Sequence, residues 1–299
     1  MGIAFADYDN DGFMDVFVTN DNQANFLFHN RGDGTFEEVA LEAGVALANA
    51  GVPVSSMGAD FRDYDNDGLP DIFVTDLNNE AFLLFHNLGG GMFEDASYPS
   101  RLAVLSTSRG GWSAGMADLN NDGWKDLVST NSHADDNVEQ FSAYHYRQAN
   151  SIFANLGDGT FWDVTTEVGK DFQVPRAHRG CAFADFNNDG KIDMVVSSLQ
   201  DPAELWQNVS PNENHWIILK LIGTKSNRDG IGARVRIGNQ YNHMTSAVAY
   251  ASSSHYGVHF GLGKTPKIAE IEIRWPSGIA QVLRDVAPNQ RLEVREPEK

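Results

Sequence analysis

The sequence contains a single cysteine, Cys181, and no long apolar run. One thiol excludes an intrachain disulfide, and the surrounding segment RGCAFA favours a buried, inert side chain. No stretch reaches the roughly 18 apolar residues that a membrane-spanning helix needs. The opening residues also lack the basic and then apolar pattern of a signal peptide.

Positive charge is scarce as well. The chain has 22 Lys and Arg against 41 Asp and Glu, a formal net charge of −19. So acidic a surface argues against nucleic acid as a partner. The sequence also lacks any amphipathic helix of useful length, so a helical fold is not indicated.

The acidic residues gather in four copies of the pattern D-x-[DN]-x-D-G-x-x-D, at 7–15, 63–71, 118–126 and 185–193. We call these segments loops one to four. Their starts are 56, 55 and 67 residues apart, which is the length of a repeated supersecondary unit. The patterned positions are Asp7, Asp9, Asp11, Asp15; Asp63, Asp65, Asp67, Asp71; Asp118, Asn120, Asp122, Asp126; and Asp185, Asn187, Asp189, Asp193.

Each loop lies between the same neighbours. An apolar run precedes it, a β-branched or alternating run follows it, and an aromatic-x-Asn signature comes next, at 27–30, 84–87, 152–155 and 205–208. Three copies continue through a glycine turn to another aromatic residue. Strand, loop, strand, strand, turn and strand is the outline of a propeller blade.

The predicted fold class is therefore all-β, with a partial or small β-propeller of four blades over residues 1–212. The fourth unit lacks the glycine turn and the strand after it. We expect an open arc, or an arc in which a later strand such as 216–223 caps one exposed edge.

The loops predict calcium sites. Asp at positions 1, 3, 5 and 9 directs several carboxylate oxygens to one point, and Gly at position 6 allows a sharp bend. An EF-hand is excluded because position 12 is Val18, Val74, Ser129 or Val196 instead of Glu, and because strands flank the loops. About four Ca²⁺ would offset the crowded carboxylates, whereas Mg²⁺ prefers a tighter shell with several waters. The alternative is that the loops are Asx-rich turns without an ion.

A change of charge predicts a second domain over residues 213–299. Residues 1–212 hold 10 Lys and Arg against 33 Asp and Glu, while the remainder hold 12 against 8. The tail has alternating apolar segments at 216–223, 233–238, 268–275 and 291–296, which predict a small β domain.

These motifs resemble known families. The acidic loops with their xFxN and GDGTF signatures resemble the FG-GAP or VCBS repeats of integrin-type β-propellers, and HWIILKLIGTKSNRDGIGARVRIG with IEIRWPSG looks like an ASPIC/UnbV domain. Together they resemble the cartilage acidic protein 1 family. The resemblance implies a secreted, extracellular or periplasmic, calcium-loaded propeller of about seven blades, used for adhesion or recognition and without established catalysis. The chain then corresponds to the C-terminal part of a longer member.

The long third unit supplies a candidate ligand loop at 131–150. Its polar and aromatic residues could bind a sugar, a peptide or a metal, although the loop could equally be a solvated excursion that packs on its neighbours. The residues are His133, Asp135, Asp136, Glu139, Tyr144, His145, Tyr146 and Arg147. A second candidate is the cation group Arg109, Arg176, His178 and Arg179, which could face an anionic ligand or pair with the surplus Asp.

Two functions of different class follow. The first is a calcium-binding, non-enzymatic recognition or adhesion module for a protein or carbohydrate ligand. The second is a polysaccharide-active lyase or glycosidase that uses the 131–150 loop, which would require carboxylates that converge on one cleft. A third, an assembly scaffold, would pair through exposed blade edges.

Overall fold

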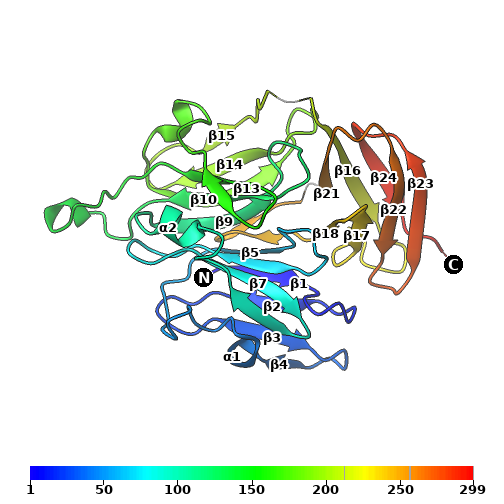
Figure 1. Ribbon diagram of the computed structural model, residues 1–299, viewed down its shortest axis with the longest axis horizontal. Helices are drawn as coiled ribbons and strands as arrows, with labels where there is room; N and C mark the ends of the chain where they lie inside the picture. Colours follow the sequence, from blue (N-terminus) through cyan, green and yellow to red (C-terminus); the bar gives the residue numbers. More distant parts are fainter. Residues whose placement is uncertain (212, 256, 299) are drawn as a thin grey trace.

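The computed structural model describes residues 1–211, 213–255 and 257–298. Three sheets of four antiparallel strands follow one another along the chain (Figure 1). They are β1 (Ile3–Ala6), β2 (Asp15–Val18), β3 (Phe26–Asn30) and β4 (Phe36–Glu38); β5 (Ala59–Arg62), β6 (Asp71–Val74), β7 (Leu83–Gly89) and β8 (Met92–Asp95); and β9 (Gly111–Ala117), β10 (Asp126–Asn131), β11 (Ser151–Asn155) and β12 (Phe161–Asp163).

In each sheet the strands pair in the order of the sequence, as in a propeller blade. The acidic loop joins the first strand to the second, so its ninth residue opens the second strand. The register in the first sheet runs from Ile3 opposite Val18 to Ala6 opposite Asp15. The all-β class and the strand order within a unit are confirmed.

The fourth unit has three strands: β13 (His178–Ala184), β14 (Asp193–Ser198) and β15 (Glu204–Trp206). β15 is the last strand of its sheet, as the missing glycine turn predicts. The short helices α1 (Ala40–Ala43) and α2 (Leu102–Ser106) follow the outer strands of the first two units, and the 3-10 turns η1 (Val138–Gln140) and η2 (Asp171–Gln173) lie in the third. Within the described ranges, no helix has the length and apolar character to span a membrane.

The tail contains two sheets that pack against each other (Figure 1). One is β21 (Val258–Gly263), β16 (His215–Ile222) and β24 (Gln290–Arg295), and the other is β18 (Gln240–His243), β17 (Arg234–Ile237), β22 (Ile268–Arg274) and β23 (Ala280–Val286). Alternate residues such as Ile217, Leu219, Val235, Ile271 and Ile273 point inward and form their shared core.

A tail hairpin reaches the inner strands of the blades. It consists of β19 (Ala247–Val248) and β20 (Ser252–Ser253). Tyr250 bridges to Gly2 beside β1, and the Phe183 N–H of β13 donates to Ser254 Oγ at 2.9 Å. The hairpin thus links the first and fourth units. The expectation that 216–223 caps a blade edge is wrong, because β16 pairs with β21 and β24 inside the tail.

Aromatic residues on the outer strands lock neighbouring units together. Phe93 of the second unit packs on Tyr8 of loop one, and Phe161 of the third unit packs on Tyr64 of loop two, with ring centroids 5.8 Å apart in both pairs. Both phenylalanines are buried. The glycine turn and its aromatic residue therefore join successive blades as well as closing a hairpin.

Candidate functional site: the acidic loops and the tail that covers them

All four loops share one backbone. Position 4 is always Asn, in the left-handed region, with φ of 62°, 64°, 58° and 60°. Position 6 is always Gly, with φ of 98°, 94°, 100° and 80°. Asn tolerates the left-handed region better than most residues, and Gly has no Cβ to clash there. These two residue types set the bend that brings the carboxylates together.

The aspartate at position 1 closes each loop. Its carboxylate accepts the N–H of the position 6 glycine, at 3.0 Å for Asp7, 2.9 Å for Asp63, 2.8 Å for Asp118 and 2.9 Å for Asp185. Asp7 Oδ1 is buried without a hydrogen-bond donor, so this carboxylate keeps a free oxygen. An unpaired buried oxygen of this kind fits a cation ligand.

The aspartate at position 9 has a structural role that the spacing alone did not reveal. Asp71 accepts the Tyr64 N–H at 3.0 Å and the Asn87 N–H at 2.9 Å, which ties the loop to the aromatic-x-Asn signature. Asp15, Asp126 and Asp193 make the equivalent pair of bonds. All four are buried. A metal-binding role for position 9 stays a prediction.

In loops one and two, carboxylates and a histidine converge. Ligand atoms of Asp7, Asp9 and Asp11 lie within 4.8 Å of one another, as do those of Asp63, Asp65 and Asp67. A second group in each unit joins positions 3 and 9 to a histidine from the third strand: Asp9, Asp15 and His29, and Asp65, Asp71 and His86. These acidic clusters could hold a metal ion.

The histidines partly compensate the carboxylates. His86 Nδ1 lies 3.2 Å from Asp71 and 3.3 Å from Asp65, and the hydrogen bond with Asp71 raises the pKa of His86 to about 9. His29 lies 3.3 Å from Asp15 and 3.6 Å from Asp9. The sequence contained a signal for this contact. The residue before the Asn of the aromatic-x-Asn signature is His in the two units that have Asp at position 3 of the loop. In the two units with Asn120 or Asn187 at position 3, that residue is Ala154 or Gln207.

Burial makes the charged form of these carboxylates costly. Desolvation raises the pKa of Asp7 and of Asp63 to about 6, and nearby aspartates add to the shift in both. Burial likewise raises the pKa of Asp71 and Asp126 to about 7. A divalent cation would favour the ionised carboxylates and offset both causes.

Loops three and four carry one carboxylate fewer. Asn120 Nδ2 donates to Asp122 at 2.8 Å, and Asn187 Nδ2 donates to Asp189 at 2.9 Å. An amide at position 3 therefore pairs with the carboxylate at position 5 and lowers the repulsion without a histidine. The amide oxygen remains a possible ligand.

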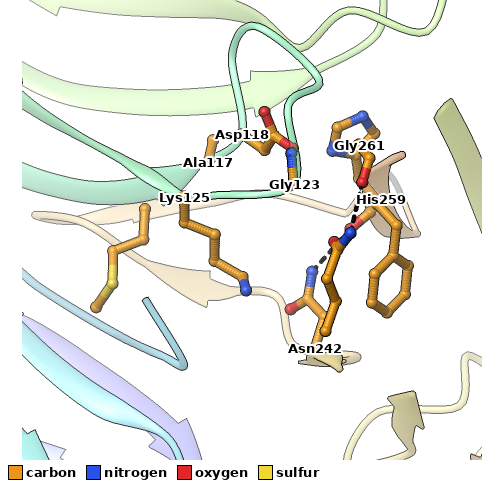
Figure 2. A pocket seen from close by; sticks show the side chains of 10 residues that line it. Ala117, Asp118, Gly123, Lys125, Asn242, His259 and Gly261 are labelled. Atoms are coloured by element: carbon orange, nitrogen blue, oxygen red, sulfur yellow. Dashed lines mark hydrogen bonds between the residues drawn. The ribbon is translucent and has the colours of Figure 1, made fainter. Parts of the chain in front are cut away.

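The tail lies on the loops. The Arg234 guanidinium donates to Gly68 O of loop two at 2.6 Å, and the Trp216 ring lies against Gly190 of loop four. At loop three, a Cβ on Gly261 would come within 2.0 Å of Asp118 Oδ2, so only glycine fits there. Figure 2 shows Asp118 and Gly123 of this loop facing Asn242, His259 and Gly261 of the tail.

Lys125 joins three parts of the molecule. This buried side chain of loop three donates from Nζ to Asp63 O of loop two at 2.6 Å and to Tyr241 O of the tail at 3.0 Å. Burial lowers its pKa, while the nearby Asp63 opposes that shift. The equivalent residues are Met14, Pro70 and Ile192, so the repeat pattern gave no sign of this link.

The 131–150 insert makes contacts in several directions. Tyr144 stacks on His133 and its hydroxyl bonds Asn79 Oδ1 in the second unit. Glu139 accepts the Tyr146 N–H at 2.8 Å, and Arg147 pairs with Asp201 at 2.9 Å. His145, Asp135 and Asp136 are exposed. The insert thus contacts other elements through Tyr144 and Arg147, while Asp135 and Glu139 lie beside His133 and His145 within it. A ligand for this loop stays a prediction.

The inner cations pair with carboxylates or rings. Arg109 pairs with Asp163, and both Arg176 and His178 contact Glu204, at 2.9 and 2.8 Å. Arg179 lies over the Trp112 ring, 3.7 Å from its centroid. These contacts favour the pairing alternative over an anion site.

Blades with repeated acidic loops and an attached β sandwich define a class of repeat protein. The FG-GAP-like repeat model matches residues 7–74, 63–129 and 134–196, and the ASPIC and UnbV model matches residues 223–299. The repeat matches cover more than half of the chain. The protein therefore belongs to the FG-GAP-like repeat family, and the resemblance noted from its motifs is confirmed.

Similar proteins include cartilage acidic protein 1 of Xenopus tropicalis, 27% identical over 232 residues that cover 71% of this chain and 33% of the relative. Cartilage acidic protein 1 of Homo sapiens is 45% identical over 62 residues, 20% of this chain and 9% of that protein. A T-cell immunomodulatory protein homolog of Plasmodium yoelii yoelii is 28% identical over 45% of this chain and 19% of its own length. The chain thus spans about a third, or less, of the length of these relatives.

Among solved structures, an Agrocybe aegerita lectin that recognises non-reducing terminal N-acetylglucosamine has a TM-score of 0.38 and 20% identity, over 69% of this chain and 51% of the lectin. The Photorhabdus luminescens Tc holotoxin pore has a TM-score of 0.37 and 16% identity, over 68% of this chain and 9% of that chain. Scores of this size are too low to transfer a ligand.

Proposed function

We propose that the four loops bind Ca²⁺ and that the chain is a calcium-dependent, non-enzymatic recognition or adhesion module that works outside the cell or in the periplasm. Repetition is the observation that supports the metal sites most. Two loops gather three carboxylates each within 4.8 Å, and the other two share their backbone and their closing hydrogen bonds. Turns without an ion do not require this set of carboxylates.

The residues fit calcium. The donors are carboxylate and amide oxygens, which hard cations prefer, and Asp7 Oδ1 lacks any other partner. We assign the ligands to positions 1, 3 and 5 of each loop, with position 9 as a further donor. Acidic loops of this kind suit extracellular calcium, for which Kd values of roughly 10⁻⁴ to 10⁻³ M suffice.

A non-enzymatic role is supported by the insert. Tyr144 and Arg147 bond to other elements, while Asp135 and Glu139 lie beside histidines of the insert itself. This is not the pair of carboxylates facing one cleft that glycoside hydrolysis needs. Recognition then relies on rigid blades and the loops between them, with a protein or a carbohydrate as the ligand.

Counting bound calcium tests the proposal. The full chain, dialysed against calcium at about 10 mM, is expected to hold about four ions by atomic emission spectrometry. Asp67→Ala alters an exposed ligand position and should remove about one ion, while Asp136→Ala in the insert should remove none. A protein that holds less than one ion, or an unchanged count in Asp67→Ala, would contradict the assignment.

A further inference from the structure

The interface between the second and third units is complete, and it shows what the next interface lacks. Phe161 on the outer strand β12 is fully buried between the two units, against Tyr64. The core cluster that contains Phe161 draws on both units: Phe73, Leu84 and Ala96 from the second, and Met116, Leu127 and Phe153 from the third.

The interface between the third and fourth units has an equivalent lining, to which Phe172 adds by packing on Trp206, but no residue in the place of Phe161. A cavity of about 490 Å³ remains. Seven residues of its wall stand at the repeat positions of seven residues of the complete interface. Leu119, Val128, Ile152, Val164, Phe183, Met194 and Trp206 here correspond, in that order, to Tyr64, Phe73, Leu84, Ala96, Met116, Leu127 and Phe153 there. The position of Phe161 has no counterpart, because the chain continues through Ser210 and Pro211 instead of a glycine turn.

The backbone beside this cavity is an open strand edge. In the other units a carbonyl of the third strand accepts an N–H that follows the outer strand: Val39 to Leu27 at 2.8 Å, Ala96 to Leu84 at 2.8 Å and Val164 to Ile152 at 3.1 Å. The equivalent residue is Leu205 of β15, the last strand of its sheet. Its side chain is 66% exposed. Such an edge can accept one more strand.

Charge indicates the kind of strand that fits. The described residues that line the cavity include Asp126 and Glu167 but no Lys or Arg. The blade units as a whole hold 33 acidic residues against 10 basic ones. A strand with lysine or arginine beside an aromatic residue therefore suits this edge better than an acidic one.

We propose that the open edge of β15 and the cavity beneath it bind an extended segment of a partner protein. The segment adds a fourth strand to the fourth unit, places an aromatic side chain in the cavity and carries basic residues around it. Main-chain hydrogen bonds supply affinity and the cavity supplies specificity, as in other cases of strand addition.

The chain offers its own probe for this site. A labelled peptide copies residues 157–164, with lysine in place of Asp158 and Asp163, and is titrated by fluorescence anisotropy into the full protein with calcium present. We expect saturable binding with Kd below about 1 mM. The same peptide with Phe161→Ser should bind at least about tenfold more weakly, which corresponds to about 1.4 kcal/mol.

Two protein variants locate the binding. Val168→Trp places a large side chain at the cavity wall, and Leu205→Pro removes an N–H from the open edge, where proline is tolerated. Each should weaken peptide binding at least about tenfold. Val174→Trp is the matched control, since Val174 is 42% exposed and Val168 is 40% exposed, and it should bind normally.

Three results would overturn the proposal. The first is no saturable binding of the basic peptide, and the second is equal binding of the Phe161→Ser peptide. The third is a protein that sediments as a dimer that Val168→Trp dissociates, which would assign the edge to a second copy of this chain. Circular dichroism of both variants checks that lost binding does not come from unfolding.

Discussion

The first two acidic loops and the last two have the same backbone but different charge. Loops one and two carry four carboxylates each and a histidine from the third strand, whereas loops three and four replace one carboxylate by Asn and lack the histidine. The bend comes from the invariant Asn and Gly, and the anchor comes from the aspartate at position 9. The comparison teaches that the backbone and the charge of a loop are set by different residues.

The largest effect is expected where both kinds of loop are alike. Asp71→Ala in loop two and Asp126→Ala in loop three each leave two N–H groups without their acceptor. Each should lower the free energy of unfolding by about 3 to 5 kcal/mol, measured by urea denaturation in EDTA. The exposed Asp171→Ala is the control. A loss below about 1 kcal/mol in either variant would show that the anchor is not shared.

Acid should weaken the contact between the tail and the loops. Burial lowers the pKa of His243 to about 3, with Arg62, Lys125 and Arg234 nearby, and lowers that of His259 to about 4. Because these values lie below that of an unfolded histidine, stability is present above about pH 6.5 and is lost as the pH falls toward 3 or 4.

A comparison of His243→Gln with the unaltered chain separates the effect of histidine protonation from that of the carboxylates, which titrate in both proteins. Between pH 7 and 4.5, His243→Gln should lose about 2 to 3 kcal/mol less free energy of unfolding than the unaltered chain. The measurement is urea denaturation at both pH values in EDTA. Identical pH profiles would remove His243 from the account.

Lys125 is a difference that is confined to loop three, because the equivalent residues of the other loops are Met14, Pro70 and Ile192. Lys125→Met leaves Asp63 O and Tyr241 O without their donor, and we expect a loss of about 1 to 3 kcal/mol. The exposed Lys170→Met should have no effect beyond about 0.5 kcal/mol. Equal thermal unfolding of both variants would show that the lysine does not hold the tail to the loops.

The smallest effect converts one kind of loop into the other. His86→Ala removes the partner of Asp65 and Asp71 and should cost about 1 kcal/mol without divalent ions. Adding Asp65→Asn reproduces the pattern of the third unit and should recover most of that loss. A double variant no more stable than His86→Ala would show that charge balance does not explain why histidine accompanies Asp at position 3.

Much of the blade architecture could be predicted because its signals are local and repeated. The Asn and Gly of each loop, the aromatic-x-Asn strand and the missing glycine turn of the fourth unit each have a direct structural counterpart. The wall of the cavity below β15 also follows from the repeat alignment.

Contacts between distant segments could not be predicted in this way. Residues 247–253 have no repeat or strong alternation, yet they pair beside β1 and β5. Lys125 stands where other units have apolar residues or proline, and its partners lie 62 and 116 residues away.

The most direct test of the central claim is thermal unfolding of the full chain, first in EDTA and then with calcium restored near 1 mM. If divalent cations offset the carboxylate repulsion, four sites at ten times their Kd would add about 1.4 kcal/mol each. The melting temperature should then rise by at least about 5 °C. An unchanged melting temperature, with no calcium bound, would contradict the account.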